Sequence, residues 1–333
     1  MISRVAEACF WMHRHMERAD AMARLLRVNR SFVLDAPLPP ERKWYPLLVV
    51  SGEQDHFDEI HGVEARSDGT AVESYLTWSR ENAVSLASAL YWARENARTV
   101  REVVGLDVWE VLNELWLWFR DGAARHAYED DADAFYRRIS DSVAMFQGVC
   151  SNTMLHEDAL DFMRIGMLLE RAGQTARVLD MHHHTFDAAG TDAETVEESA
   201  LAQIQWLALL RSMSGTTPFF KRARAAPNGR RVVAFLVLDP SFPRSVLHCV
   251  RRASGLLSSM RPRPDLGRRS WELCTALSHS FDGLDGRALV KRGVHAELTR
   301  IVDATSEIAT AVHEDYFDIG GTPPISVEAE KPE

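Results

Sequence analysis

A ten-residue phrase occurs twice in this chain, and it constrains the fold more than any other feature. The first copy spans residues 17–26 (ERADAMARLL), and the second spans residues 170–179 (ERAGQTARVL), 153 residues later. Six of the ten positions are identical. The Glu and the second Arg of each copy are seven residues apart, about two turns of a helix, so both lie on nearly the same face. The sequence therefore predicts a duplicated helical unit with a fixed polar constellation.

A second match, at an offset of 157 residues, extends the duplication. The matched pairs are Ser88 with Ser245, Leu90 with Leu247, and Arg94 with Arg251. Asn82 and Asp239 open the two matched segments. Both are predicted to be helix N-caps, because their side chains accept hydrogen bonds from the free amides of a first turn. We therefore expect one domain over residues 1–318, built from half-repeats at about 1–125 and 155–318.

Composition limits the classes of function. The chain has 333 residues, is 46% hydrophobic and carries a formal charge of −10, which is typical of a soluble globular protein. The negative charge disfavours a nucleic-acid partner. No stretch is long and apolar enough for a membrane span, and Arg4, Glu7 and Arg14 interrupt any signal-peptide pattern. A cytoplasmic protein without a membrane partner is expected.

Hydrophobic periodicity predicts an all-α protein. From Ile2 to Leu26, apolar residues recur at alternating spacings of three and four, which predicts a first helix of about 30 residues. Residues 232–238 are the one run that resembles a strand, although they also fit a buried connector. Pro and charged residues predict a disordered tail over 319–333. Further helices are predicted over 82–104, 107–120, 129–150, 155–185, 196–213, 242–260, 268–281 and 286–318.

Carboxylate and guanidinium side chains alternate beside the apolar seam of the repeated helices. On the first helix this stripe includes Arg14, Glu17 and Arg24, and on the second it includes Glu170 and Arg177. Such groups must satisfy each other or a ligand when they are buried. The stripe is therefore either an ion-pair lattice that sets helix register or a polar cavity whose Arg forks take a carboxylate or phosphate.

Metal and nucleotide chemistry have little support in the residues. Four Cys lack paired spacing. The single Glu-x-x-His, from Glu53 to His56, lies in a loop-like acidic segment, whereas a helical di-iron site needs this motif on two helices. No Gly-rich phosphate loop and no nucleophile elbow is visible. No metal and no cofactor are expected on this chain itself.

Several motifs in this order resemble the bacterial alpha-E domain family, which implies an all-helical fold over residues 1 to about 315. The motifs are residues 10–19 (FWMHRHMERA), residues 93–98 (ARENAR), Thr153-Met154, Phe162 with Gly166 and Glu170-Arg171-Ala172, and residues 242–246 (FPRSV). Members of this family are typically encoded beside, or fused to, a circularly permuted ATP-grasp protein, and often beside a transglutaminase-like protease. The resemblance therefore implies a partner in amide- or peptide-bond formation, with ATP and Mg²⁺ held by the ATP-grasp protein.

The resemblance also implies functional residues and shows two departures. The family often has Gly-Arg before the second Glu-Arg, where this chain has Gly166-Met167, and His13 and His15 replace a common Gly and aromatic residue. A strictly two-fold symmetric Arg site is therefore not expected. The candidate residues are Arg14, Glu17, Arg18, Arg24, Arg94, Glu95, Asn96, Glu170, Arg171, Arg177, Asp239, Arg244 and Ser245.

Three functions fit these observations. The first is an accessory subunit that positions a charged substrate for an ATP-grasp ligase. The second is a separate enzyme acting on the activated or ligated product, with Glu17 or Glu170 as general base at a pKa raised by the apolar seam. The third is a purely structural bundle in which the ion pairs only set register.

Overall fold

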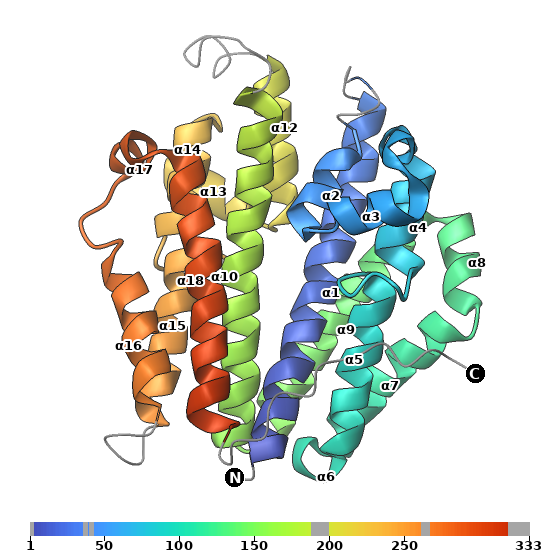
Figure 1. Ribbon diagram of the computed structural model, residues 1–333, viewed down its shortest axis with the longest axis vertical. Coiled ribbons are helices and arrows are strands. Elements are labelled where there is room, and N and C mark those ends of the chain that lie inside the picture. Colours follow the sequence, from blue (N-terminus) through green and yellow to red (C-terminus); the bar gives the residue numbers. More distant parts are fainter. Residues whose placement is uncertain (1–2, 36–38, 40–42, 188–199, 261–266, 319–333) are drawn as a thin grey trace.

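Two long parallel helices form the centre of the molecule (Figure 1). In the computed structural model, which describes residues 3–35, 39, 43–187, 200–260 and 267–318, these helices are α1 (Ser3–Asp35) and α10 (Asp158–Asp187). Contacts between them advance together along both chains, from Phe10 beside Gly166 to Arg14 beside Glu170. The two copies of the repeated phrase therefore lie side by side.

Gly166 permits the close approach of the two central helices. A Cβ atom at this position would lie 2.3 Å from the carbonyl oxygen of Phe10, which is closer than any real contact. Glycine is the residue that lets backbone approach this closely. The neighbouring side chains fill the junction, since Phe10 and Met163 are both buried.

Each central helix has the same arrangement of helices around it. Helices α5 and α9 pack against α1, and α7 covers both from outside; helices α15 and α18 pack against α10, and α16 covers both (Figure 1). The described chain contains helices and no strands, which confirms the predicted all-α class. The six flanking helices are α5 (Leu86–Thr99), α7 (Leu106–Arg120), α9 (Ala132–Thr153), α15 (Val246–Ser259), α16 (Arg268–His279) and α18 (Val294–Tyr316).

Shorter helices connect these elements. Among them, α2 packs against α10, as the flanking helix α18 also does. The shorter helices are α2 (Tyr45–Ser51), α3 (Gln54–His61), η2 (Val63–Ser67), α4 (Gly69–Trp78), α6 (Arg101–Val104), α8 (Ala123–Asp130), α12 (Ala200–Ser212), α13 (Thr216–Ala223), α14 (Gly229–Leu238) and α17 (Gly286–Arg292).

Residues 232–238 form most of helix α14, so the strand-like interpretation is wrong. The side chain of Asn228 caps this helix by accepting a hydrogen bond from the amide of Arg231 at 3.0 Å. Val232, Val233 and Leu236 are all buried. A helix buried on most sides loses its polar face, so its period disappears from the sequence.

The predicted N-caps Asn82 and Asp239 are also wrong. The caps of α5 and α15 are Ser85 and Ser245, whose hydroxyls accept hydrogen bonds from the amides three residues later at 3.0 and 3.2 Å. Asn82 and Asp239 instead accept hydrogen bonds from amides within the preceding loops. The hydroxyl of serine satisfies the first turn just as an Asx side chain would, so residue type alone did not locate the helix start.

These caps place the local correspondence between the halves at an offset of 160 residues rather than 157. Helices α4 and α14 have the same length at this offset, as do α5 and α15. Ser85 donates a hydrogen bond to the carbonyl of Ser79, and Ser245 donates one to the carbonyl of Asp239, again 160 residues on. The division into half-repeats at 1–125 and 155–318 stays a prediction.

Four further sequence-based expectations concern the cysteines, a membrane span, a metal site and the C-terminal tail. All four cysteines are buried and free. Within the described ranges, no helix could cross a membrane, and no three His, Cys, Asp or Glu side chains gather as a metal site would require. The predicted tail at 319–333 lies outside the described residues.

Candidate functional site

The two Glu-Arg dipeptides exchange partners between the central helices. Arg171 of α10 donates two hydrogen bonds to Glu17 of α1, from Nε at 2.8 Å and from Nη2 at 2.7 Å. Arg18 of α1 donates two to Glu170 of α10, from Nε at 2.8 Å and from Nη2 at 3.1 Å. Bidentate pairs of this kind are the strong form of the Arg–carboxylate contact. The repeated phrase therefore fixes α1 against α10 by reciprocal pairing.

The surroundings of Glu17 form a closed charge network. Glu17 is 0% exposed and accepts further hydrogen bonds from Arg244 at 2.9 Å and Gln147 at 3.2 Å. Arg244 also pairs with Asp20 at 2.7 Å, and Asp20 accepts a hydrogen bond from Arg24 at 2.7 Å. Every charge here therefore has an opposite charge within hydrogen-bond distance.

The loop that carries Arg244 is held by Thr175 and by two of the predicted site residues, Asp239 and Ser245. The carbonyl of Arg244 accepts a hydrogen bond from the hydroxyl of Thr175 at 2.9 Å, which ties the loop to α10. Asp239 turns the start of the loop by accepting hydrogen bonds from the amides of Ser241 and Phe242, and Ser245 ends it as the cap of α15. Asp239 and Ser245 thus position Arg244.

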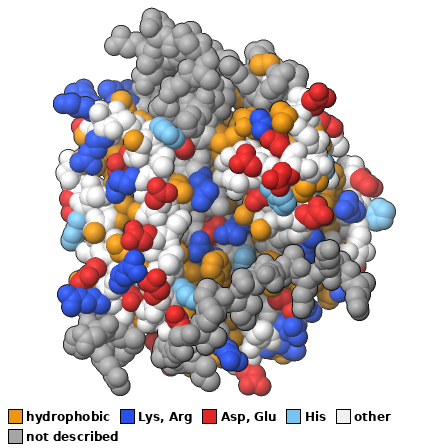
Figure 2. All heavy atoms as spheres, viewed as in Figure 1, with side chains coloured by type: hydrophobic (Ala, Val, Ile, Leu, Met, Phe, Trp, Pro, Cys, Tyr) orange, Lys and Arg blue, Asp and Glu red, His pale blue; other side chains and the backbone are white. Residues whose placement is uncertain are grey.

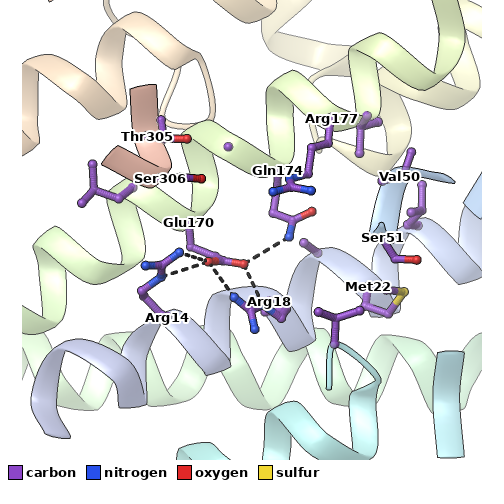
Figure 3. A pocket seen from close by; sticks show the side chains of 16 residues that line it. Arg14, Arg18, Met22, Val50, Ser51, Glu170, Gln174, Arg177, Thr305 and Ser306 are labelled. Atoms are coloured by element: carbon purple, nitrogen blue, oxygen red, sulfur yellow. Dashed lines mark hydrogen bonds and ion pairs between the residues drawn. The ribbon is translucent and has the colours of Figure 1, made fainter. Parts of the chain in front are cut away.

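The surroundings of Glu170 differ because this carboxylate faces a cavity (Figure 3). Arg14 donates two hydrogen bonds to Glu170, from Nε at 3.0 Å and Nη2 at 2.9 Å, and Gln174 donates one at 3.1 Å. Together with the pair from Arg18, these bonds hold the carboxylate in one orientation. The cavity beyond it measures about 120 Å³, several times the roughly 10–15 Å³ that one water needs.

Helices α1, α2, α10 and α18 supply the walls of this cavity. Among the described residues, Arg177 forms no ion pair, and Figure 3 shows it beside Gln174, away from Glu170. The cavity is lined by Arg14, Arg18, Ala21, Met22, Leu25, Val50, Ser51, Val84, Leu169, Glu170, Gly173, Gln174, Arg177, Val178, Thr305 and Ser306. Three guanidinium groups and one carboxylate therefore line the cavity, beside an apolar wall. Basic, acidic and hydrophobic side chains also gather in the middle of this face of the molecule (Figure 2).

The two glutamates are ionised, so the predicted rise of their pKa is wrong. Burial would raise the pKa of Glu17, but the charges of Arg171 and Arg244 outweigh it and lower that pKa to about 2. Burial likewise acts on Glu170, and Arg18 and Arg14 hold its pKa well below the ordinary value. A carboxylate with so low a pKa is a weak general base at neutral pH.

The cavity favours an anion. Burial lowers the pKa of Arg14, and the like charges of Arg18 and Arg177 act in the same direction, while Glu170 opposes them. Burial acts on Arg18 as well, but Glu170 outweighs it and raises the pKa of that guanidinium. With Arg14 and Arg177 also at the wall, the guanidinium groups outnumber the one carboxylate. Guanidinium groups bind carboxylate and phosphate groups through paired hydrogen bonds, and a further anion in the cavity would relieve the repulsion.

A family comparison matches residues 1–317 to Alpha-E, described as a predicted alpha-helical domain with a conserved ER motif. The chain belongs to the Alpha-E family. The Glu-Arg dipeptides at 17–18 and 170–171 have this two-residue sequence, and here they exchange partners. No solved structure matches the Alpha-E chain.

The Alpha-E chain is also similar to uncharacterized proteins of Mycobacterium bovis and Mycobacterium tuberculosis. Two of these relatives are 26% identical to it over 339 aligned residues, which cover 93% of this chain. The chain spans 37% of the length of these relatives. In them, the matched domain is thus part of a longer protein.

Arg94, Glu95 and Asn96, which the resemblance indicated as functional, lie away from Glu17, Glu170 and the cavity. Arg94 pairs with Glu95 at 2.6 Å and donates a hydrogen bond to Asn113 of α7 at 3.2 Å. Asn96 donates one to the carbonyl of Trp92 on its own helix. None of the three lines the cavity or contacts Glu17 or Glu170. The expectation that these residues belong to the polar groove is therefore wrong. They lie at the α5–α7 contact and on the surface of α5 instead.

Sequence reasoning missed Asp20, Gln147 and Gly173 as parts of the Alpha-E site. Asp20 was detectable, because it lies four residues before Arg24 on the same helix face. Gly173 occupies the matching position of the second phrase, so a comparison of the two copies would have shown the difference. Gln147 lies on α9 and reaches Glu17 from outside the repeat, so no local signal identified it.

Proposed function

We propose that this chain is an accessory subunit that positions a charged substrate for an ATP-grasp ligase in amide- or peptide-bond formation. The observation that carries the proposal is the cavity beside Glu170, which is lined by three guanidinium groups and one carboxylate. Such a cavity binds an anion without itself supplying a nucleophile or a base. ATP and Mg²⁺ would belong to the ligase, which performs the activation step.

Two further points support work with a partner. The resemblance to the alpha-E family implies an ATP-grasp protein encoded beside, or fused to, the domain. The relatives described above are much longer than the segment they share with this chain, which agrees with a domain that works beside another. A transglutaminase-like protease is a second partner implied by the resemblance, and cytoplasmic location goes with this proposal.

The two alternative functions fit less well. A separate enzyme with Glu17 or Glu170 as general base needs a carboxylate that takes up a proton near neutral pH, and both pKa values are lowered instead. A purely structural role fits the closed network around Glu17, where each charge is paired. It does not account for Arg177 at the cavity wall.

The test is reconstitution with an ATP-grasp protein encoded beside this chain. The two proteins are co-expressed and co-purified, and ATP hydrolysis is measured over a pool of carboxylic acids and amines. A stable complex whose substrate-dependent ATP turnover requires this chain is expected. Absence of both a complex and any change in turnover would contradict the proposal.

A matched pair of variants separates positioning from assembly. Arg177→Gln removes the cavity charge that has no carboxylate partner among the described residues, and it is expected to lower turnover while the complex still forms. Arg98→Gln removes an exposed charge on α5, paired with Glu95, and should leave turnover unchanged. Equal turnover in the two variants would remove the cavity from the proposal.

A further inference from the structure

The two copies of the repeated phrase differ at one position that decides how the charges are compensated. At an offset of 153 residues, Asp20 corresponds to Gly173 and Arg24 corresponds to Arg177. Asp20 bridges two guanidinium groups, those of Arg24 and Arg244, each at 2.7 Å. Gly173 has no side chain, so the guanidinium at position 177 lacks the carboxylate that its counterpart has.

A second substitution enlarges the same space. At the offset of 160 that relates the loops before α5 and α15, Arg244 corresponds to Val84. Val84 lines the cavity beside Glu170. The cavity therefore occupies the space that, beside Glu17, is filled by the carboxylate of Asp20 and the long side chain of Arg244. Arg14 supplies the second guanidinium for Glu170 in place of the one that Arg244 supplies for Glu17.

The Glu170 side has one carboxylate fewer than the Glu17 side. Around Glu17, the three guanidinium groups of Arg24, Arg171 and Arg244 face two carboxylates. Around Glu170, three guanidinium groups face one carboxylate. The difference is a single negative charge, beside the backbone of Gly173.

We propose that the cavity binds a small carboxylic acid whose carboxylate occupies, beside Gly173 and Arg177, the place that the Asp20 side chain occupies on the other side. This names the substrate class of the proposed function and rests on it only in calling the ligand a substrate. The apolar part of the acid packs against Met22, Leu25 and Val50, which line the same cavity. Ser51 and Ser306 are within the wall for a polar substituent.

The apolar wall of the cavity and the carboxylate of the matching site both favour a carboxylate over phosphate. A cavity of about 120 Å³ with an apolar wall suits an acid with a short hydrocarbon chain. A phosphate group carries up to two charges and three acceptor oxygens, and it would place polar oxygens against Met22 and Leu25. One carboxylate is the group that the matching site already contains.

The first experiment fills the cavity from within. Gly173→Asp adds the carboxylate at the matching position, four residues before Arg177. The new Cβ would meet one atom, Oγ1 of Thr305 at 3.2 Å, so a shift of a few tenths of an ångström accommodates it. Gly173→Asn is the control of equal shape without charge. We expect Gly173→Asp to melt at a higher temperature than Gly173→Asn at pH 7, and the reverse order would overturn the proposal.

The second experiment measures binding to the isolated, full-length chain. Butyrate, butyramide and inorganic phosphate are titrated separately by calorimetry at low salt. We expect butyrate to bind, butyramide not to bind, and Arg177→Gln to weaken butyrate about tenfold or more. Gly173→Asp should abolish butyrate binding, and Gly173→Asn should retain more of it.

The outcomes separate this inference from the proposed function. Butyrate binding without any ligase partnership would support the carboxylate site and remove the proposed function. Equal binding of butyramide, tighter binding of phosphate, or no binding of butyrate would each overturn the site, whatever the ATP assay shows. Since Arg177→Gln alters a partly exposed side chain, its result stands even if a Gly173 variant fails to fold.

Discussion

The side of the central helix pair at Glu17 and the side at Glu170 contain the same Glu-Arg phrase in two different electrostatic states. Around Glu17, every guanidinium group has a carboxylate partner, and the carboxylate of Glu17 is 0% exposed. Around Glu170, the same pairing persists, but a guanidinium group lacks its counter-charge and a cavity opens. A repeated ion pair can therefore stabilise the fold on one side and border a charged cavity on the other. A single position, Asp20 against Gly173, accounts for most of the difference.

Neutralising the two glutamates should give the largest difference in stability between the two sides. Glu17→Gln leaves Arg171 and Arg244 buried without their carboxylate and should destabilise the protein by about 3–5 kcal/mol. Glu170→Gln should cost less, about 1–3 kcal/mol, because water and dissolved anions can reach Arg14 and Arg18 through the cavity. Urea unfolding measures both. Equal costs would mean that the two sides are electrostatically alike.

Acid should weaken the Glu17 side through His13. This side chain is buried beside Glu17, Arg171 and Arg164, and among the described residues neither ring nitrogen has a hydrogen-bond partner. Burial lowers its pKa from 6.5 to about 4, so the unfolded chain binds more protons between these values. The contribution of neutral His13 to the free energy of unfolding is therefore fully present above pH 6.5. It falls by roughly 3 kcal/mol as the pH drops to 4.

Variants test the assignment of this pH dependence. His13→Phe, beside Phe146, should flatten the fall in melting temperature between pH 6.5 and 4. His15 should still contribute, because burial lowers its pKa to about 3. His126→Gln alters an exposed side chain and should leave the pH profile unchanged. An unchanged profile in His13→Phe would refute the assignment.

Removing the bridging carboxylate should make the Glu17 side resemble the Glu170 side. Asp20→Asn deprives Arg24 and Arg244 of their shared partner and should cost about 2 kcal/mol, read from urea unfolding. The matched control is Asp133→Asn, whose half-exposed pairs with Arg27 and Arg137 should contribute at most about 1 kcal/mol. If the two variants lose the same stability, the bridge at Asp20 is no stronger than a surface pair.

The smallest expected loss of stability comes from removing the serine N-caps of α5 and α15, which the two sides share. Ser85→Ala and Ser245→Ala each remove an N-cap and should each cost about 1 kcal/mol. Thermal unfolding of the two single variants and the double variant measures whether the costs are equal and additive. A much larger loss at Ser245 would show that the loop carrying Arg244 depends on its cap more than the equivalent loop does.

Local patterns in the sequence located the fold well. The three-and-four spacing from Ile2 to Leu26 predicted α1, and the Glu-Arg phrase identified the pair of helices at the centre. Segment 232–238 failed because burial on most sides removed the helical period from α14. The caps at Asn82 and Asp239 failed because several cap-forming residues follow each other, and only the hydrogen bonds distinguish Ser85 and Ser245.

The site was predicted in its residues and not in its chemistry. Glu17, Arg18, Glu170 and Arg171 were all identified, but their crossed pairing depends on the register of α1 against α10. The lowered pKa of Glu17 depends on Arg171 and on Arg244, which lies in a loop more than 220 residues away. The lowered pKa of Glu170 depends on Arg18 and Arg14 of the other central helix. Long-range partners of this kind decide whether burial or charge controls a carboxylate, and no local pattern encodes them.

The crossed Glu-Arg pairs have a consequence for the origin of the chain. A contact in which residue i of one element binds residue j of another, while j of the first binds i of the second, is the signature of a two-fold interface between identical subunits. If the halves arose by duplication, a half-length ancestor would close this same contact as a homodimer. Fusion of the two copies would then free each Glu-Arg phrase to change its neighbours separately. A symmetric dimer has aspartate at both positions or at neither, whereas a fused chain can keep Asp20 and replace its counterpart with Gly173.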